Sequence, residues 1–378
     1  MSTQRSIFED VKTDKPADET SKGGFIDAGR AGARKAIAFW LLLLFFLVAC
    51  MILVGGLTRL TDSGLSITEW KPVTGAVPPM SEQVWQSEFS KYKEIPEYQL
   101  QNKGMSLAEF KVIYWWEWGH RQLGRLVGLV WAVGFLFFLL KRQIPKGWTG
   151  RLLFVGVMGG LQGTIGWWMV SSGLSGRMLD VASYRLATHL GLAFVILLFL
   201  IWFSWQLQQS ETELFQARRN KEQRFVVLTT LLLALAFIQI LSGALVAGID
   251  AGRGYIYWPL MNGEFLPSES FDYTPLWSNF FENPALVQFN HRILGYLTFI
   301  VVLFLWQASR KSAIAYTRRA CVLVLIAVVA QMILGIITVL NAAPWQWAIF
   351  HQLGAIVVVV SILNARFSAL YPRSQTLR

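Results

Sequence analysis

The chain has 378 residues, of which 54% are hydrophobic and only 15% are charged, and its mean hydropathy is positive. These values lie far from those of soluble globular domains, so they exclude a soluble enzyme or binding module. The net charge of +11 would suit a nucleic-acid-binding protein, but most Lys and Arg residues stand between apolar runs and at the chain ends. The charge therefore indicates membrane topology and no nucleic-acid partner.

Apolar runs of about 20 residues recur along the chain, and each can cross the hydrocarbon core of a bilayer, which is about 30 Å thick. Backbone polar groups find no water there, so these runs must be helices. We predict an all-α, polytopic membrane protein. Its eight transmembrane helices are expected at residues 36–58, 122–140, 152–171, 187–206, 225–248, 290–307, 318–340 and 346–366.

Basic residues gather in segments that fall on one side of the membrane if the eight helices alternate: 1–35, 141–151, 218–224, 310–319 and the C-terminal tail. The positive-inside rule makes that side the cytoplasm, so both termini are expected there. Residues 1–35 open with "MSTQRSIFEDVKTDKPADETSKGG", which is too acidic for a mitochondrial transit peptide and is no cleavable signal. We expect this segment to be a disordered cytoplasmic tail.

Two segments on the opposite side are long. Residues 59–116 include "RLTDSGLSITEWKPVTGAVPP" and an amphipathic stretch at 81–95, and residues 249–288 are rich in aromatic residues, prolines and acids. Their Trp and Tyr residues suit a membrane–water interface. We expect these segments to cover a cavity at the outer face.

The two halves of the chain resemble each other. The strongest matches are "HRQLGR" (120–125) with "HRILGY" (291–296), "LQGTIGWWMV" (161–170) with "AQMILGIITV" (330–339), and "THLGLA" (188–193) with "FHQLGA" (350–355). The second match aligns Gln162 with Gln331 and Gly166 with Gly335.

A repeat of this kind predicts two four-helix halves. An even number of spans gives both halves the same orientation, so the repeat is parallel, which argues against inverted-repeat transporters. We predict two tandem, pseudo-symmetric four-helix bundles, an N-terminal half at 36–210 and a C-terminal half at 211–378.

The chain contains four histidines, His120, His189, His291 and His351, and each is expected at the start of an even-numbered helix near the outer leaflet. A single histidine there is as well explained as an amphipathic anchor at the membrane surface. Four in equivalent places are better explained by function, because ionisable residues inside a membrane are costly.

Two imidazoles that face each other from two helices of a bundle suit haem iron, which takes one or two axial ligands in an apolar slot. A zinc ion usually needs more ligands, and no cysteine or carboxylate cluster accompanies the histidines. Gly124 and Gly295 follow His120 and His291 by four residues on the same helix face, where they leave room for a flat ring.

The arginines that follow two of the histidines, Arg121 and Arg292, lie at the aqueous edge and could hold haem propionates through charge-assisted hydrogen bonds. Contact with lipid phosphate is the alternative.

Glu117 precedes His120 by three residues and shares its helix face, whereas the second half has Gln288 in this place. The difference suggests a division of labour, with one haem held permanently and the other facing a reactive carboxylate. The alternative is that Glu117 is a solvated carboxylate at a helix start, where the helix dipole stabilises it.

These motifs resemble the heme A synthase family, in the type that lacks a cysteine pair in an outer loop, as in proteobacteria and mitochondria. The resemblance runs from the first helix to the last and rests on "GGLTRLTDSGLSITEWKPVTGAVPP" (55–79), "EWGHRQLGR" (117–125), "YRLATHLGLA" (184–193), "NHRILGY" (290–296) and "HQLGA" (351–355).

The resemblance implies an oxidoreductase that converts heme O to heme A for cytochrome oxidase. The C8 methyl group of heme O would be hydroxylated in succession and would lose water to leave a formyl group. His120 and His189 would bind the iron of the substrate, Glu117 would be the catalytic carboxylate, and His291 and His351 would hold a heme b cofactor.

The resemblance also implies a multi-pass protein of the bacterial inner (plasma) membrane with its haem sites toward the periplasm. Heme O synthase and cytochrome oxidase assembly proteins are the implied partners, and the protein could form a homo-oligomer. Two rival functions remain: a diheme b-type cytochrome that exchanges electrons with quinone, and a chaperone or transporter that delivers haem.

Overall fold

The computed structural model describes residues 25–174 and 180–372, and side chains from residue 32 onward. Within this part of the chain the structure is helical, and eight helices are long and apolar enough to span a membrane. The predicted all-α polytopic fold with eight spans is therefore confirmed. The spans are α1 (Phe25–Leu60), α4 (Leu107–Leu140), α5 (Thr149–Val170), α6 (Ser183–Leu207), α8 (Gln223–Gly248), α10 (Pro284–Ser309), α11 (Ala315–Leu340) and α12 (Trp345–Leu370).

All eight spans begin before their expected starts, and two of them begin more than ten residues earlier. Helix α1 already starts at Phe25, within the segment expected as a tail, and residues 1–24 lie outside the described residues. Helix α4 starts at Leu107, because Ser106 and Glu109 form a reciprocal cap in which each accepts a hydrogen bond from the other's backbone N–H. His120 therefore lies well inside α4, not at its start as expected.

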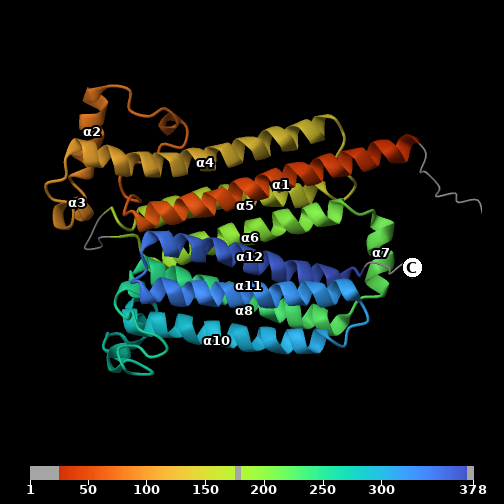
Figure 1. Ribbon diagram of the computed structural model, residues 1–378. Helices are drawn as coiled ribbons and strands as arrows, with labels where there is room; N and C mark the ends of the chain where they lie inside the picture. The colour runs from red at the N-terminus through yellow and green to blue at the C-terminus, as the bar shows by residue number, and fades with distance from the viewer. Residues whose placement is uncertain (1–24, 175–179, 373–378) are drawn as a thin grey trace, which may run out of the picture.

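The eight spans pack as two squares in the same cyclic order. In the first half α1 contacts α4, α4 contacts α5, α5 contacts α6, and α6 returns to α1. In the second half α8, α10, α11 and α12 contact one another in the corresponding order. The histidine-bearing helices, α4 with α6 and α10 with α12, thus occupy the diagonals of the squares. The halves meet mainly where α6 packs on α8 and α1 packs on α12 (Figure 1).

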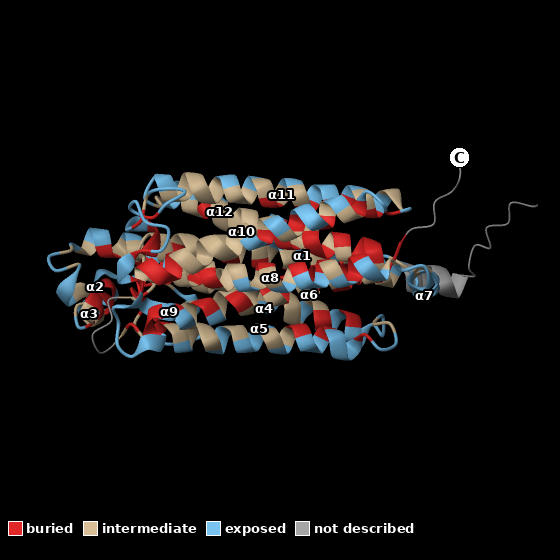
Figure 2. Ribbon diagram, turned by 90° about the horizontal axis from the view of Figure 1, so that it is seen from below, coloured by how far each residue is buried: buried red, intermediate tan, exposed pale blue. Residues whose placement is uncertain are grey.

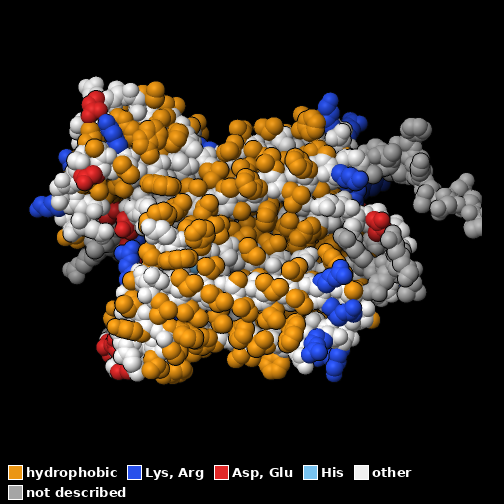
Figure 3. Space-filling model, in the orientation of Figure 1, with side chains coloured by type: hydrophobic (Ala, Val, Ile, Leu, Met, Phe, Trp, Pro, Cys, Tyr) orange, Lys and Arg blue, Asp and Glu red, His pale blue; other side chains and the backbone are white. Residues whose placement is uncertain are grey.

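Apolar side chains form both the core and the surface of the helical region. Fully buried residues run along α1, α6, α8 and α12, including Leu41, Leu197, Leu232 and Ile362. Helices α5 and α11 lie at opposite margins and expose much of their surface (Figure 2). Exposed apolar side chains cover the middle of the molecule. Charged side chains lie at both ends: Lys and Arg predominate at the end that carries α7, and Lys and Arg are mixed with Asp and Glu at the other (Figure 3). This distribution is the one expected of a protein surrounded by lipid.

The two ends of the molecule differ. The short helix α7 (Glu211–Arg219) joins the halves at the basic end and buries none of its residues. The opposite end carries the long segments that precede α4 and α10, with η1 (Thr74–Ala76), α2 (Glu82–Tyr92), α3 (Pro96–Leu100), η2 (Ala251–Arg253), η3 (Ser268–Phe271), η4 (Leu276–Ser278) and α9 (Asn279–Glu282). The amphipathic stretch expected at 81–95 is α2.

Aromatic rings attach α2 to the start of α4. Phe89 stacks on Phe110 with ring centroids 4.9 Å apart, and Trp85 contacts Tyr114 edge-on at the same separation. Lys91 adds ion pairs with Glu69 and Glu88, and hydrogen bonds from Lys71 and Lys91 lower the pKa of Glu69 to about 2. The segment between α1 and α4 is therefore a packed cover over the N-terminal half.

A buried carboxyl group in this cover makes stability depend on pH. Glu97 is 3% exposed, accepts hydrogen bonds from Tyr92 and Asn102, and its other oxygen has no partner within the described residues. Burial raises its pKa to about 8 from the ordinary 4.5. Between these pH values the folded protein binds more protons than the unfolded chain, so the free energy of unfolding should fall as pH rises, by up to about 1.4 kcal/mol per unit.

Glu97→Gln should remove this fall in the free energy of unfolding, because the neutral amide mimics the protonated acid. Thermal unfolding in detergent between pH 5 and pH 8 measures the pH dependence of stability. The stability difference between variant and wild type should grow in favour of the variant as pH rises, whereas Glu94→Gln, at an exposed position, is the control. Parallel pH profiles for wild type and Glu97→Gln would contradict the prediction.

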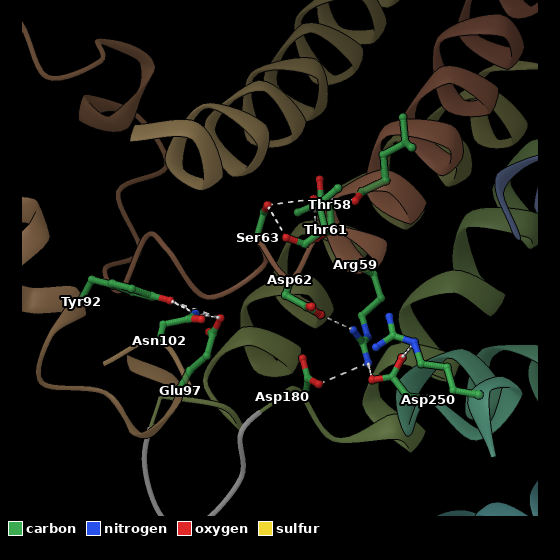
Figure 4. Close-up of polar contacts among 12 residues, drawn as sticks. Thr58, Arg59, Thr61, Asp62, Ser63, Tyr92, Glu97, Asn102, Asp180 and Asp250 are labelled. Carbon is green, nitrogen blue, oxygen red and sulfur yellow. Dashed lines mark hydrogen bonds and ion pairs between the residues drawn. The ribbon is translucent and has the colours of Figure 1, made fainter. Parts of the chain in front are cut away.

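A cluster of charges links the halves at the end opposite α7. The side chain of Arg59, in the last turn of α1, is 11% exposed and contacts Asp62 at 2.9 Å, Asp180 at 3.2 Å and Asp250 at 3.1 Å (Figure 4). Asp62 follows α1, Asp180 precedes α6 and Asp250 follows α8. Burial raises the pKa of Asp180, against the attraction of the Arg59 guanidinium. One guanidinium therefore holds three segments from both halves.

Candidate active site

The histidines of the second half lie close to each other. The ring centroids of His291 and His351 are 6.4 Å apart, and the rings are nearly perpendicular. Two metal–imidazole bonds of about 2 Å each, plus a ring radius of about 1.1 Å on each side, span about 6 Å. The observed separation therefore fits one iron between the two imidazoles.

The histidines of the first half occupy the corresponding diagonal. His120 on α4 and His189 on α6 are close enough to interact electrostatically. Both rings are partly buried, like those of the second half. Each half thus brings together the pair that its sequence predicts.

A glycine on the neighbouring helix faces each imidazole. A Cβ atom would lie 3.1 Å from His120 Nε2 if added at Gly55, and 2.8 or 2.9 Å from Cε1 of the other three imidazoles. The glycines that face these three imidazoles are Gly166, Gly243 and Gly335. Any larger residue would displace the ring, so the glycines allow the imidazoles to sit against the helix backbone.

Three glutamines stand four residues before three of these glycines. The amide of Gln162 donates to the main-chain oxygen of His189 at 2.9 Å, and those of Gln239 and Gln331 donate to His291 and His351 in the same way. Sequence comparison aligned Gln162 with Gln331 but missed Gln239 and the contact with histidine. The sequence does contain a pattern that could have revealed them, because Gln-x-x-x-Gly occurs in α5, α8 and α11.

Glu117 is buried in α4 at 2% exposure, which rules out the alternative of a solvated carboxylate at a helix start. One carboxylate oxygen accepts from Arg121, with Nη2 at 2.6 Å. The other accepts from Ser66 Oγ at 2.8 Å and from the backbone N–H of Ile67 at 2.7 Å. All these partners donate, so the carboxylate is held in one orientation as an acceptor.

The second half builds a related frame around an amide, with carbonyl acceptors in place of two of the donors. Gln288 accepts from Arg292 at 3.0 Å and donates to the main-chain oxygens of Ala251 and Tyr255. Arg121 and Arg292 also correspond, because each donates to two or more loop carbonyls. At this matched position the first half therefore has a carboxylate where the second half has an amide.

The residues present fit haem better than a multidentate metal site. Within residues 25–174 and 180–372, His, Cys, Asp and Glu form no group of three or more that could hold a metal ion. Nδ1 of His189 and of His351 is buried with no partner in this part of the chain. Paired imidazoles, orphaned nitrogens and facing glycines are the features that axial ligation of a flat macrocycle requires.

Comparison with known proteins places this chain in a family. A family profile described as "Cytochrome oxidase assembly protein" matches residues 38–363. The chain belongs to this family.

Curated relatives named "Heme A synthase" align along the whole chain. The relative from Dinoroseobacter shibae is 61% identical over 379 residues, which cover 100% of this chain and 99% of its own. Those from Ruegeria pomeroyi and Paracoccus denitrificans are 60% and 56% identical, and the alignments cover at least 98% of each chain. The resemblance to the heme A synthase family is therefore confirmed.

Proposed function

We propose that the protein is a heme A synthase, a membrane oxidoreductase that oxidises the C8 methyl group of heme O to the formyl group of heme A through successive hydroxylations. The observation that carries this proposal is the matched pair of imidazole sites with a buried carboxylate, Glu117, at only one of them. The names of the full-length relatives support it.

The first half would hold the substrate, with His120 and His189 as axial ligands of the iron in heme O. Glu117, fixed by Arg121, Ser66 and Ile67, would present a negative charge to the substrate. That charge can stabilise positive charge that develops on the porphyrin methyl group, or accept a proton from an attacking water. The cover between α1 and α4 would exclude bulk solvent from the site.

The second half would hold a permanent heme b through His291 and His351. When bound, this group supplies one-electron transfer. Arg121 and Arg292, each next to a proposed ligand, remain our proposed partners for haem propionates. We place the protein in the bacterial inner membrane with both termini in the cytoplasm and the haem sites toward the periplasm, because the basic end would face the cytoplasm. Heme O synthase and oxidase assembly proteins are the proposed partners.

The proposal is tested by expressing the chain in cells that make heme O but lack their own heme A synthase. Extracted haems are separated by chromatography. Heme A should appear with the wild-type chain and disappear with His120→Ala. A diheme electron carrier or a haem chaperone would yield no formyl-bearing haem in either case, and that result would refute the enzyme.

His291→Ala should release the resident heme b, because one of its two axial ligands is lost. Loss of even an outer-shell partner weakens metal binding by about 10- to 100-fold, so heme b in the purified protein should fall by more than about 10-fold. Phe304→Leu, at an exposed position of the same helix, is the control. Unchanged heme b content in His291→Ala would remove this residue from the ligand set.

A further inference from the structure

The glutamine amides act as clamps between helices at the level of the histidines. The donor–acceptor distances to the histidine main-chain oxygens are 2.9 Å from Gln162, 3.0 Å from Gln239 and 2.8 Å from Gln331. These bonds fasten α5 to α6, α8 to α10 and α11 to α12. Such hydrogen bonds stabilise helix pairs inside a membrane.

The fourth helix pair has no such amide. The residue four positions before Gly55 is Met51, on α1. Its Cε lies 3.2 Å from where a Cβ would be at Gly124, as Gln239 Nε2 lies 3.5 Å from the same point at Gly295. Met51 therefore occupies the place of the glutamine, but a thioether has no hydrogen to donate to His120.

In the pair of Gln239 and His291 the glutamine amide also contacts a nitrogen of the imidazole ring. Gln239 Nε2 is 3.2 Å from Nδ1 of His291, and the Oε1 atom of each of the three glutamines is buried without a partner in the described part of the chain. An imidazole that binds a metal usually needs a partner for its second ring nitrogen. Gln239 supplies such a partner to His291, and Met51, which has no hydrogen to donate, supplies none to His120.

Two differences between the halves therefore fall on one helix pair. On α1 and α4 the chain has Met51 and Glu117, where α8 and α10 have Gln239 and Gln288. Helix α4 is also among the least buried spans and packs less closely on α5 than α10 does on α11. A weakly packed helix thus carries both His120 and the carboxylate.

We propose that Met51 leaves His120 as an exchangeable haem ligand, so that the N-terminal half can take up a haem substrate and release the product, whereas the amide-clamped His291 and His351 retain a permanent haem. This inference rests on the proposed function, since only a substrate site needs exchange. Met51 and the glutamines are positioning residues that act through the histidines.

Loss of haem from the purified full-length protein tests the proposal. The protein in detergent is loaded with ferric heme b, and transfer to excess apomyoglobin is followed by absorbance. The wild type should lose haem in a fast and a slow phase, and His120→Ala assigns the fast phase to the N-terminal half. Met51→Gln should slow the fast phase by about 3- to 30-fold, the effect of one interhelical hydrogen bond. Met51→Leu, which fills the space without a donor, should leave it unchanged.

The reciprocal substitution, Gln239→Met, and a spectroscopic measurement complete the test. Gln239→Met should accelerate the slow phase by a similar factor and leave the fast phase as it is. Electron paramagnetic resonance of the ferric protein should show that Met51→Gln alters only the low-spin signal that His120→Ala abolishes. A general change in stability would move both phases and both signals.

The proposal is overturned if Met51→Gln behaves like Met51→Leu in both measurements. If Met51→Gln does not fold, Gln239→Met decides, and an unchanged slow phase overturns the proposal. No turnover is measured and the probe is ferric heme b, so a chain that makes no heme A would refute the proposed function without altering this result.

Discussion

Membranes that carry Glu117→Gln should contain no detectable heme A and should accumulate heme O or a hydroxylated intermediate. The fold should survive, because glutamine has nearly the same size as glutamate and its oxygen can accept from Arg121 as Gln288 accepts from Arg292. The variant loses the hydrogen bond that the backbone N–H of Ile67 donates to the carboxylate, which should cost about 1 to 3 kcal/mol. What the substitution removes is a negative charge and a proton acceptor. Such a group contributes about 10²- to 10⁴-fold to the rate.

Haem profiling of the membranes measures the effect, and the haem-to-protein ratio of the purified variant shows whether the ligands still bind. The matched control is Gln288→Glu, which places the carboxylate at the site proposed for a permanent cofactor and should leave the heme A level close to that of the wild type. Wild-type amounts of heme A in Glu117→Gln would exclude a catalytic role for this carboxylate.

Arg59→Met should destabilise the protein by about 1.5 to 3 kcal/mol, the usual effect of losing hydrogen bonds to charged groups, because the guanidinium is buried but its carboxylate partners are partly exposed. The methionine would leave Asp62, Asp180 and Asp250 close together, with only the more exposed guanidinium of Arg253 beside Asp250. Because protonation relieves repulsion among carboxylates, the variant should regain stability relative to the wild type as the pH is lowered. Thermal unfolding in detergent at several pH values measures both effects.

Arg253→Met is the control for Arg59. Arg253 lies 3.6 Å from Asp250, but its side chain is 51% exposed, so its removal should change stability by less than about 1 kcal/mol. Equal effects of the two substitutions would show that Arg59 does not hold the halves together.

Hydropathy predicted all eight spans because lipid imposes a long apolar run on each of them. It missed the first turns of α4, since residues 107–121 mix aromatic and charged side chains. That stretch is helical because α2 covers one of its faces, a contact that no local pattern reveals. The predicted start at 122 was wrong for this reason.

The site was predicted unevenly. The four histidines stood out as the only ones in the chain, and their pairing followed from the repeat. The role of Glu117 was left open because its burial depends on Ser66 and Ile67, some fifty residues away in sequence. The Arg59 cluster was missed, because its aspartates come from three distant segments. Met51 is visible only by comparison with Gln239.

The exposed connector α7 has a consequence for how the two sites could become different. It buries none of its residues, and the halves touch through α6, α8, α1 and α12. Two separate copies of a four-helix chain could form the same contact as a symmetric dimer, but every substitution in such a dimer appears at both sites. Joining the copies in one chain removes this constraint. One chain can then carry a carboxylate, Glu117, in its first half and an amide, Gln288, at the matched place in its second half.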